Sequence, residues 1–552
     1  MKKTARTLIS VLLLISMLLS MAVVASAEGE TTVLPSCYYT GEKVSAYKTE
    51  IENGYANYTQ QNPLVIDSAD EFVAFQQVSV SNNFSGKYVV LATDIVLNQG
   101  NASDWAAGNN TEGLFAWTPI NGFTGTFDGQ GHTISGLYHN DTSTAGSNPA
   151  YIGLFGQVEG AANIKNLGVV NTYFSTTGWY CGGIAARLKA GATVSGCYFD
   201  GIINSNNASG GIVAMVSAAT SANATIKECA AFGTISCTKE GAGGIVGFVP
   251  RYAADMGVNV EDCVNFATVK GGWHTGGIAG QCANINIDRC VNFGSVKDLM
   301  DGKHGITDSI TNALLGTVYQ GDKETASTVS ITNSYRFDGQ LMCNAGAGGY
   351  TGVSAINDAT ASSGAMENCK GATAATTLNA FDFAGTDANK GDWVTRQGDY
   401  PMPKAVYDNF FKIKMKYVQN TAVDNKSTDA TDDDTYDVRF IAEVSTLTYD
   451  KVGFIVEVSY GEESKTVTLT ANNVYKSIKA GDGETYDTVS APDGKYFVAL
   501  SITDIPTSAG EVTFTVTPVG DYTDENVTDE LGAAYTIVYN ADGTYKSATK
   551  AA

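Results

Sequence analysis

The chain has little positive charge, little proline and, beyond its first residues, no long apolar run. Its 552 residues include 34 Lys and Arg against 57 Asp and Glu, for a formal net charge of -23, and only 10 Pro and 4 His. Nucleic acids and anionic membrane surfaces bind clusters of Lys and Arg, so this balance excludes both as partners. No Gly-rich phosphate loop, zinc-ligand spacing or nucleophile elbow is present. The sequence therefore excludes the commonest nucleotide, zinc and hydrolase sites.

The one long apolar run lies at the N-terminus and resembles an export signal. Lys2, Lys3 and Arg6 precede an apolar stretch over residues 8–24, and Ala25-Ser26-Ala27 follows as a small-x-small cleavage pattern. We predict a signal peptide over residues 1–27, hence a secreted protein, either released or held non-covalently at the cell surface. A membrane anchor is the alternative; serines interrupt the run and no stop-transfer charges follow it. We expect no membrane insertion after cleavage.

Sixty glycines accompany a repeat of about thirty residues. A first strand recurs as apolar-x-x-Leu, Cys or Ser at intervals of 30, 30, 32, 34, 27 and 44 residues. Its copies begin at Ile134, Ile164, Val194, Ile226, Val260, Ile287 and Ile331. Self-similarity at a fixed period indicates a solenoid in which each coil buries its apolar residues against its neighbours.

A second strand lies between these copies and begins with glycine. Its copies begin at Gly153-Leu154-Phe155-Gly156, Gly183, Gly211, Gly244, Gly277 and a weaker Ala313. The spacing from this strand to the next first strand wanders between 10 and 18 residues. Insertions at one corner leave stacked strands intact, so we expect any function to lie at that corner.

Short runs of Gly, Val, Ile, Thr and Phe without helical periodicity favour strands over helices. The predicted fold is an all-β, right-handed parallel β-helix over residues 61–404, preceded by an N-terminal extension over 28–60. An up-and-down barrel is the alternative, but it would not give one equivalent strand every thirty residues. Ser68 and Glu71 form a capping box that predicts a short helix sealing the first coil. Residues 405–552 show alternating strands and predict an antiparallel β-sandwich.

The first coils resemble the GLUG-motif proteins. The resemblance depends on Gly153-Leu154-Phe155-Gly156 and on the preceding Phe127-Asp128-Gly129-Gln130-Gly131-His132-Thr133-Ile134-Ser135-Gly136-Leu137. It covers about residues 60–405 and weakens past Cys290. It implies a bacterial secreted or surface β-helix protein, often adhesin-like, and no shared catalytic residues.

Four cysteines occupy one position of the repeat: Cys197, Cys229, Cys263 and Cys290. In the two preceding coils the same position is assigned to Leu137 and Leu167, which indicates buried free thiols that act as small apolar filler. Disulfides between successive coils, such as Cys197 with Cys229 and Cys263 with Cys290, remain open because strands about 4.8 Å apart bring the thiols within bonding range. We expect no cofactor and no metal site; the acidic run over residues 424–434 holds Ca²⁺ weakly at most.

Two tryptophans, Trp179 and Trp273, stand four residues before a repeat glycine, with Asn207 and Glu240 at the equivalent places between them. One hypothesis is a ladder on which an extended glycan stacks, with Tyr180 and His274 beside the indoles. The alternative is that both rings pack over a turn.

Charged residues of the repeat are candidates for polysaccharide lyase or hydrolase chemistry. These are Asp200, Glu240, Asp262, Asp288, Arg187, Arg251 and Arg289. Asp262 and Asp288, together with Asn166, Gly196, Glu228 and Asn333, are interpreted as a polar outer stripe.

The favoured function is a monomeric extracellular binding protein or adhesin for a glycan or protein ligand. A passive spacer is the second hypothesis. A carbohydrate-active enzyme is the third, and no catalytic residue is assigned.

Overall fold

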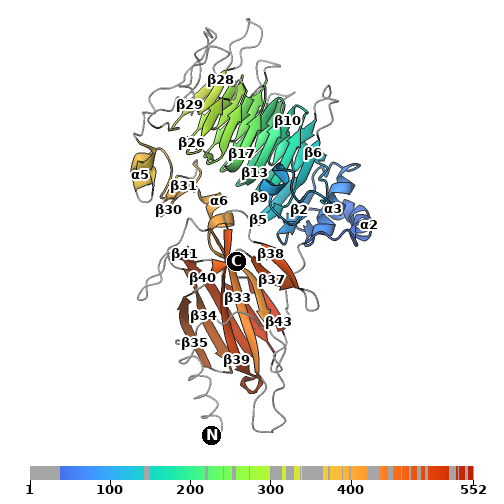
Figure 1. Cartoon of the computed structure of the whole chain (residues 1–552), viewed down its shortest axis with the longest axis vertical. Coiled ribbons are helices and arrows are strands. Elements are labelled where there is room, and N and C mark those ends of the chain that lie inside the picture. Colours follow the sequence, from blue (N-terminus) through green and yellow to red (C-terminus); the bar gives the residue numbers. More distant parts are fainter. Residues whose placement is uncertain are drawn as a thin grey trace. The chain divides into compact units, whose positions relative to one another are not determined.

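The chain divides into two compact units, residues 37–410 and the C-terminal residues from Phe411 (Figure 1). The computed structural model describes residues 38–141, 150–217, 222–239, 241–250, 257–272, 274–298, 314–318, 329–335, 337, 365–370, 373–387, 390–396, 399–420, 435–445, 452–461, 463–470, 474–475, 477–481, 486–490, 495–520, 530–531, 534–540 and 545–550. The predicted signal peptide, the acidic run, Glu240, Arg251 and Trp273 lie outside these residues.

The first unit is a parallel β-helix, as its repeat predicts. Its longest sheet contains β1 (Leu64–Ile66), β2 (Tyr88–Leu91), β3 (Ile95–Val96), β5 (Thr126–Ser135), β6 (Tyr138–Asp141), β9 (Asn163–Thr176), β12 (Thr193–Ser195), β13 (Tyr198–Ser205), β16 (Ala224–Lys227), β17 (Ala230–Cys237), β20 (Val258–Glu261), β21 (Val264–Asn265), β22 (Thr268–Gly271), β25 (Ile285–Asp288), β26 (Val291–Asn292), β27 (Val296–Asp298) and β29 (Val329–Thr332). The strand pairs of this sheet that join successive coils are parallel.

Two further parallel sheets complete each coil. One contains β4 (Ile120–Phe123), β8 (Phe155–Val158), β11 (Ala185–Lys189), β15 (Val213–Ser217), β19 (Val246–Val249), β24 (Ala279–Cys282) and β28 (Leu315–Val318). The other contains β7 (Tyr151–Ile152), β10 (Tyr180–Gly182), β14 (Ala208–Gly210), β18 (Gly241–Gly243) and β23 (His274–Gly276). Each coil bends between these two sheets at its repeat glycine.

The register confirms most of the predicted first strands. Ile164, Val194, Ile226, Val260, Ile287 and Ile331 pair position by position through successive coils. The assignment of Ile134 is wrong, because Phe127 pairs with Ile164 and Ile134 pairs with Val169. The register shifts between Asp128 and His132, where Gln130 and Gly131 take positive φ values of 50° and 79°. Leu137 therefore does not belong to the cysteine column.

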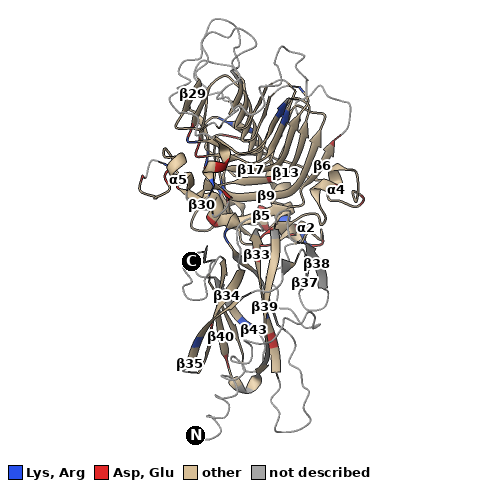
Figure 2. Cartoon of the chain, turned by 60° about the vertical axis from the view of Figure 1, so that its left-hand side comes forward, with Lys and Arg blue, Asp and Glu red and all other residues tan. Residues whose placement is uncertain are grey.

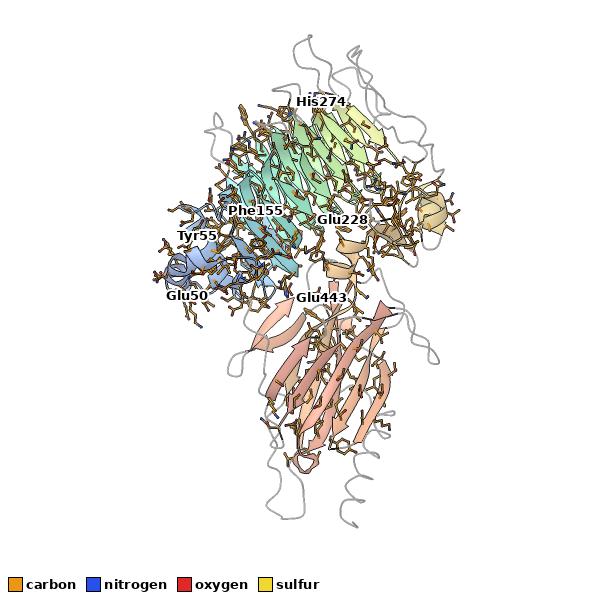
Figure 3. The ribbon with its side chains drawn as sticks, turned by 180° about the vertical axis from the view of Figure 1, so that it is seen from behind. Glu50, Tyr55, Phe155, Glu228, His274 and Glu443 are labelled. Atoms are coloured by element: carbon orange, nitrogen blue, oxygen red, sulfur yellow. The ribbon has the colours of Figure 1, made fainter. Side chains whose placement is uncertain are left out.

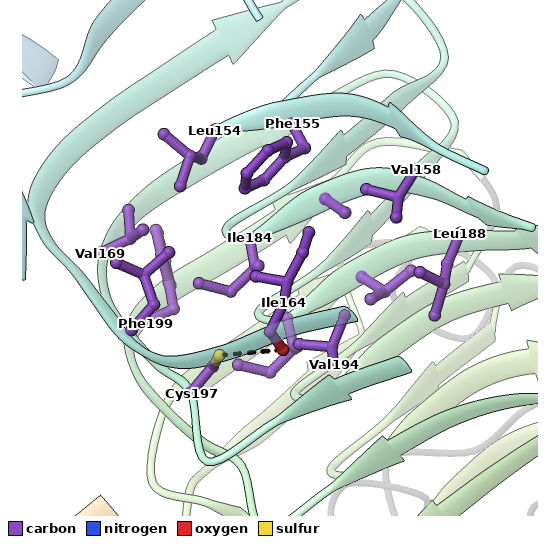
Figure 4. Close-up of a cluster of buried hydrophobic side chains, with 14 of the residues drawn as sticks. Leu154, Phe155, Val158, Ile164, Val169, Ile184, Leu188, Val194, Cys197 and Phe199 are labelled. Atoms are coloured by element: carbon purple, nitrogen blue, oxygen red, sulfur yellow. Dashed lines mark hydrogen bonds between the residues drawn. The ribbon is translucent and has the colours of Figure 1, made fainter. Parts of the chain in front are cut away.

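The core of the β-helix is a stack of apolar side chains (Figure 4). The residue after each repeat glycine is fully buried: Leu154, Ile184, Ile212, Ile245 and Ile278, and so is Leu314, which follows Ala313 in the last copy. The glycines themselves stack backbone on backbone. A Cβ at Gly183, Gly211 or Gly244 would lie 2.1 to 2.2 Å from the carbonyl oxygen of the next coil's glycine. Close approach of coils therefore requires glycine in this column.

The predicted capping helix is present and seals the first coil. α3 (Ala69–Ser79) begins after Ser68, whose Oγ accepts a hydrogen bond from the Glu71 backbone N–H. Phe72 and Phe75 of this helix are fully buried and contact Phe127. α2 (Val44–Gly54) is followed by the 3₁₀ turn Tyr55–Asn57, and the short α4 (Ala102–Ala106) lies further along the chain.

The Glu71 carboxyl makes the stability of this cap sensitive to pH. It accepts a hydrogen bond from the Asp67 backbone N–H, and burial raises its pKa to about 7, with the charges of Asp67 and Glu50 acting in the same direction. As pH rises from about 4.5 to 7, the unfolded carboxyl loses its proton before the folded one does, so the folded state loses stability. We expect Glu71→Gln to remove this loss. Urea unfolding of both proteins between pH 4 and 8 measures it, and parallel pH profiles would contradict the assignment.

After the last coil the chain returns along the outside of the β-helix. η4 (Met366–Cys369), α5 (Thr373–Thr377) and the hairpin of β30 (Trp393–Arg396) and β31 (Asp399–Pro403) lead into α6 (Lys404–Val406) and a π-helical turn, Tyr407–Phe411. Tyr400 stacks on Phe293 at 4.3 Å, whereas Phe410 contacts Tyr198 at 4.7 Å, three coils earlier. We call the described residues 390–396 and 399–410 the return segment.

The C-terminal unit is an antiparallel β-sandwich. One sheet has the order β32 (Lys414–Asn420), β33 (Thr435–Ser445), β39 (Lys495–Pro506) and β36 (Val474–Tyr475). The other has β35 (Glu463–Thr470), β34 (Val452–Tyr460), β40 (Val512–Gly520), β42 (Tyr535–Tyr539) and β43 (Tyr545–Lys550), with β41 (Glu530–Leu531) beside β40. The 3₁₀ turn Thr507–Ala509 and the hairpin of β37 (Ser477–Gly481) and β38 (Tyr486–Ser490) complete it. Phe440 from the first sheet and Phe514 from the second share one core.

Candidate functional site

An exposed indole stands at the edge of the β-helix. Trp179 is 38% exposed and is the only aromatic among the exposed large hydrophobic side chains of the described residues. Its ring meets Tyr180 edge-on at 6.1 Å, and Tyr180 stacks on Tyr151 of the preceding coil at 5.5 Å. We call Tyr151, Trp179 and Tyr180 the aromatic platform.

The other predicted ligand residues take different places. Tyr180 stands beside the Trp179 indole as expected, but it is only 5% exposed and packs behind that ring. Asn207 is half-buried in the next coil, where the carbonyl of Trp179 accepts a hydrogen bond from Ala208 N–H at 2.7 Å. His274 is half-buried and opens β23, three coils away (Figure 3). Glu240 and Trp273 lie outside the described residues, so the two-tryptophan ladder stays a prediction.

The platform rests on its own apolar cluster outside the main core. Tyr180 packs there with Ala186, Ala208, Ala214, Met215 and Phe248, and Tyr151 packs against the group. The small side chains of Ala186, Ala208 and Ala214 leave room for the larger ones of Tyr180, Met215 and Phe248. Because dense packing holds a ring in one orientation, the Trp179 indole is presented from a firm support.

Arg187 lies beside the platform, on the sheet across the bend. Its Nε donates to Ser217 Oγ at 2.5 Å and its Nη1 to Gln157 Oε1 at 3.2 Å. Its guanidinium carbon lies 5.6 Å from the centre of the Tyr151 ring. Gln157, Arg187 and Met215 are register partners in successive coils. The structure thus places Arg187, a catalytic candidate of the sequence, beside an aromatic surface.

The remaining charged candidates do not form a solvent-facing stripe. Asp262 is only 2% exposed, and both its oxygens accept hydrogen bonds from Arg289 at 2.8 and 2.9 Å. Gly391 N–H and Trp393 Nε1 of the return segment donate to the same carboxylate at 3.0 and 3.1 Å. The predicted outer stripe is therefore wrong at this point, because the returning chain covers it.

The predicted outer stripe also assigned Asp288 to the wrong position of the repeat. Asp288 stands one position earlier in the repeat, and Arg289 occupies the turn position, where it pairs with both Asp262 and Asp288. This position requires a left-handed backbone, with φ values of 52° at Asn166, 53° at Glu228, 51° at Asp262 and 52° at Arg289. Asn suits that conformation, whereas Glu and Arg adopt it at a cost of roughly 1 kcal/mol or more. We therefore interpret Glu228, Asp262 and Arg289 as structural residues of the turn.

Glu228, in the same column, lies beside the return segment (Figure 3). Burial, and to a smaller extent the charges of Asp262 and Asp392, raise the pKa of this carboxyl. Asp200 is half-buried on β13. Among the described residues, no group of three or more His, Cys, Asp or Glu side chains could hold a metal ion.

The cysteine column lies inside the coils. Cys197, Cys229, Cys263 and Cys290 are fully buried and free, and each Sγ lies within hydrogen-bonding distance of a carbonyl oxygen in the preceding coil, at 3.4 to 3.9 Å. Ser334 continues the column and accepts a hydrogen bond from Cys290 N–H at 3.0 Å. Burial raises the pKa of Cys197 and Cys263 well above the ordinary thiol value. A protonated, buried thiol is a poor nucleophile, so Cys197 and Cys263 act as core packing.

An open hollow of about 480 Å³ lies beside the end of α3. Tyr55, Asn82, Asn83, Asn121 and Glu159 are among its lining residues. The Tyr55 ring already contacts Phe84 and Lys87, and Glu159 pairs with Lys189. The hollow therefore offers polar groups but no free aromatic face.

Sequence reasoning missed Tyr151 of the aromatic platform, and Gln157 and Ser217, which bind Arg187 beside it. Tyr151 stands two residues before its repeat glycine, whereas Tyr180 stands three residues before its own. One extra residue, Gly182, shifts the spacing, although Tyr151 and Tyr180 pair in register. An alignment of the strands that precede the glycines, rather than of the glycines themselves, would have placed Tyr151 and Tyr180 at equivalent positions.

The fold defines a parallel β-helix protein with an appended β-sandwich. No family model matches the chain. Over 176 residues, 32% of this chain, it is 32% identical to halomucin from Haloquadratum walsbyi (strain DSM 16790 / HBSQ001), and the match spans 2% of halomucin's length. A crystal structure of a Bacteroides ovatus protein, described as a candidate immunoglobulin A1 protease, is 20% identical with a TM-score of 0.32, covering 50% of this chain and 85% of that one. In the described part of the chain no helix is long and apolar enough to cross a membrane.

Proposed function

We propose that this protein is a secreted, non-catalytic binding protein that holds an extracellular glycan against the aromatic platform. The export signal predicted over residues 1–27 and the resemblance of the first coils to GLUG-motif proteins support an extracellular location. The observation that carries the proposal is Trp179: an indole that is 38% exposed yet fixed from behind by Tyr180.

A sugar ring suits such a surface. Its C–H groups form an apolar face that packs on an aromatic ring, while its hydroxyls need hydrogen-bonding partners at the rim. Asn207 in the next coil and Gln157 across the bend supply amide groups near the platform. A rigid support lowers the ordering cost of binding, because the ring is already immobilised before the ligand arrives.

A passive spacer is the second candidate. The observation that favours it is that the bend beside Trp179 is filled by its own side chains, since Tyr180, Met215 and Phe248 are nearly buried. A spacer would need the platform only for packing. Binding measurements separate the two functions.

Trp179→Ala is expected to weaken glycan binding at least tenfold, about 1.4 kcal/mol, while leaving the unfolding midpoint nearly unchanged. The experiment is a glycan array with the mature chain, followed by titration calorimetry on the best ligand. Val80→Ala, at a 77% exposed apolar side chain away from the platform, is the control. If the wild-type chain binds no glycan, the binding function is wrong. If Trp179→Ala binds as the wild type does, the platform is not the site.

A further inference from the structure

We infer that the glycan held at the aromatic platform carries an anionic group, a carboxylate or a sulfate ester, which Arg187 binds. This inference rests on the proposed function and names the ligand class for the same site. It comes from how Arg187 is paired, placed and oriented.

The charge of Arg187 has no carboxylate partner among the described residues. Its hydrogen-bond acceptors, Ser217 Oγ and Gln157 Oε1, are both neutral. Arg289 and Arg396, which are also shielded from solvent, both pair with aspartates. An unpaired, half-buried cation is unexpected in a chain whose net charge is -23.

The surroundings of Arg187 sharpen this contrast. Most of the β-helix ribbon in Figure 2 carries neither acidic nor basic residues. The nearest basic position on the same strand, Lys189, already pairs with Glu159 of the preceding coil. Arg187 is thus the cation of strand β11 that remains available to an external anion.

The orientation of the guanidinium is set by three coils at once. Gln157 of the preceding coil accepts a hydrogen bond from Nη1, and Ser217 of the following coil accepts one from Nε. The Nη2 hydrogens have no partner among the described residues. A guanidinium held through Nε and Nη1 has its Nη2 hydrogens left to donate to an oxyanion.

A chain of ring contacts joins this cation to the exposed indole. The guanidinium lies over Tyr151 at 5.6 Å, Tyr151 stacks on Tyr180 at 5.5 Å, and Tyr180 meets Trp179 at 6.1 Å. The bend between the sheets that contain β10 and β11 therefore combines an apolar stacking surface on one side with a positive charge on the other. That combination matches a sugar with a C–H face and an acidic substituent, as in a uronate or a sulfated sugar.

The alternative is that Arg187 only braces neighbouring coils. A brace would contribute to stability but would not distinguish acidic from neutral ligands. The test must therefore compare ligands that differ in charge alone, and include a variant that removes a positive charge elsewhere.

The experiment measures binding of the mature chain to hyaluronan and carboxyl-reduced hyaluronan, and to dextran sulfate and dextran, by titration calorimetry at 50 and 200 mM salt. We expect at least tenfold tighter binding to the acidic member of one pair, with the preference shrinking at the higher salt. The pair that shows the preference distinguishes carboxylate from sulfate. Arg187→Gln should abolish the preference, whereas Lys165→Gln, which removes a charge paired with Asp128 on another sheet, should keep it.

Each outcome decides a different claim. Equal binding to both members of both pairs overturns the anionic ligand and leaves the proposed glycan-binding function standing. A preference that survives in Arg187→Gln, or that Lys165→Gln loses equally, also overturns it, because the attraction would then be non-specific. If the glycan array and these four polymers all fail to bind, both this inference and the proposed function fail.

Discussion

Replacing Asp262 with alanine is expected to destabilise the β-helix unit by about 3–5 kcal/mol, the cost of removing one partner of a buried ion pair. The Arg289 side chain is 8% exposed, and Asp262 takes two of its hydrogen bonds. Without that carboxylate, Arg289 retains only Asp288 as a charged partner. Urea unfolding followed by tryptophan fluorescence measures the loss of free energy.

The same substitution should release the return segment. Gly391 N–H and the Trp393 indole N–H both donate to Asp262, so both would lose their acceptor. We expect limited proteolysis of Asp262→Ala to cut near residue 390 under conditions that leave the wild type intact. Glu159→Ala, which removes one partner of a half-exposed pair with Lys189, is the matched control and should cost less than about 1 kcal/mol. Equal costs for the two variants would show that Asp262 is not a buried anchor.

Gly211→Ala is expected to destabilise the β-helix by about 3 kcal/mol or more, at the upper end of overpacking costs. A Cβ at Gly211 would lie 2.2 Å from Gly244 O, 2.7 Å from Ala231 Cβ and 2.8 Å from Ile235 Cδ1. The carbonyl belongs to the next coil's backbone and cannot move aside without breaking the strand pairing. A fall in the thermal unfolding midpoint measures the effect.

Gly257→Ala is the matched control for this prediction. It adds the same methyl group in the same unit, but its Cβ would lie 3.3 Å or more from its nearest neighbours, which include the Asn223 side chain. We expect a change within about 1 kcal/mol. If Gly211→Ala is as stable as Gly257→Ala, close backbone stacking is not the reason for glycine in this column.

The strand register of the β-helix could be predicted from the residues for six of the seven coils. Strand pairs in a solenoid join equivalent positions of successive repeats, so spacing alone aligns Val194 with Ile226 and Val260 with Ile287. The prediction was wrong at Ile134, where the Gln130–Gly131 turn adds residues and Phe127 takes the paired position instead. Apolar spacing cannot distinguish two apolar residues seven positions apart on one long strand.

The candidate site could be predicted only in part. Trp179 was found because it stands out beside the repeat glycine, but the burial of Tyr180 was not, since its neighbours Met215 and Phe248 come from coils 35 and 68 residues further on. Arg187 was recognised as a charged residue of the repeat. That its acceptors are neutral depends on side chains 30 residues away on either side.

The sequence by itself determined the export signal as a prediction, the repeat, the parallel strands and the glycine column, because each depends on residues at regular or adjacent positions. Only the tertiary structure decided that Asp262 is buried, since its partners Gly391 and Trp393 lie 129 and 131 residues away. The tertiary structure likewise decided that Trp179 is exposed and that Arg187 lies over Tyr151 without a carboxylate partner among the described residues. Burial and charge pairing depend on which distant segments meet, and no local pattern in the chain encodes that meeting.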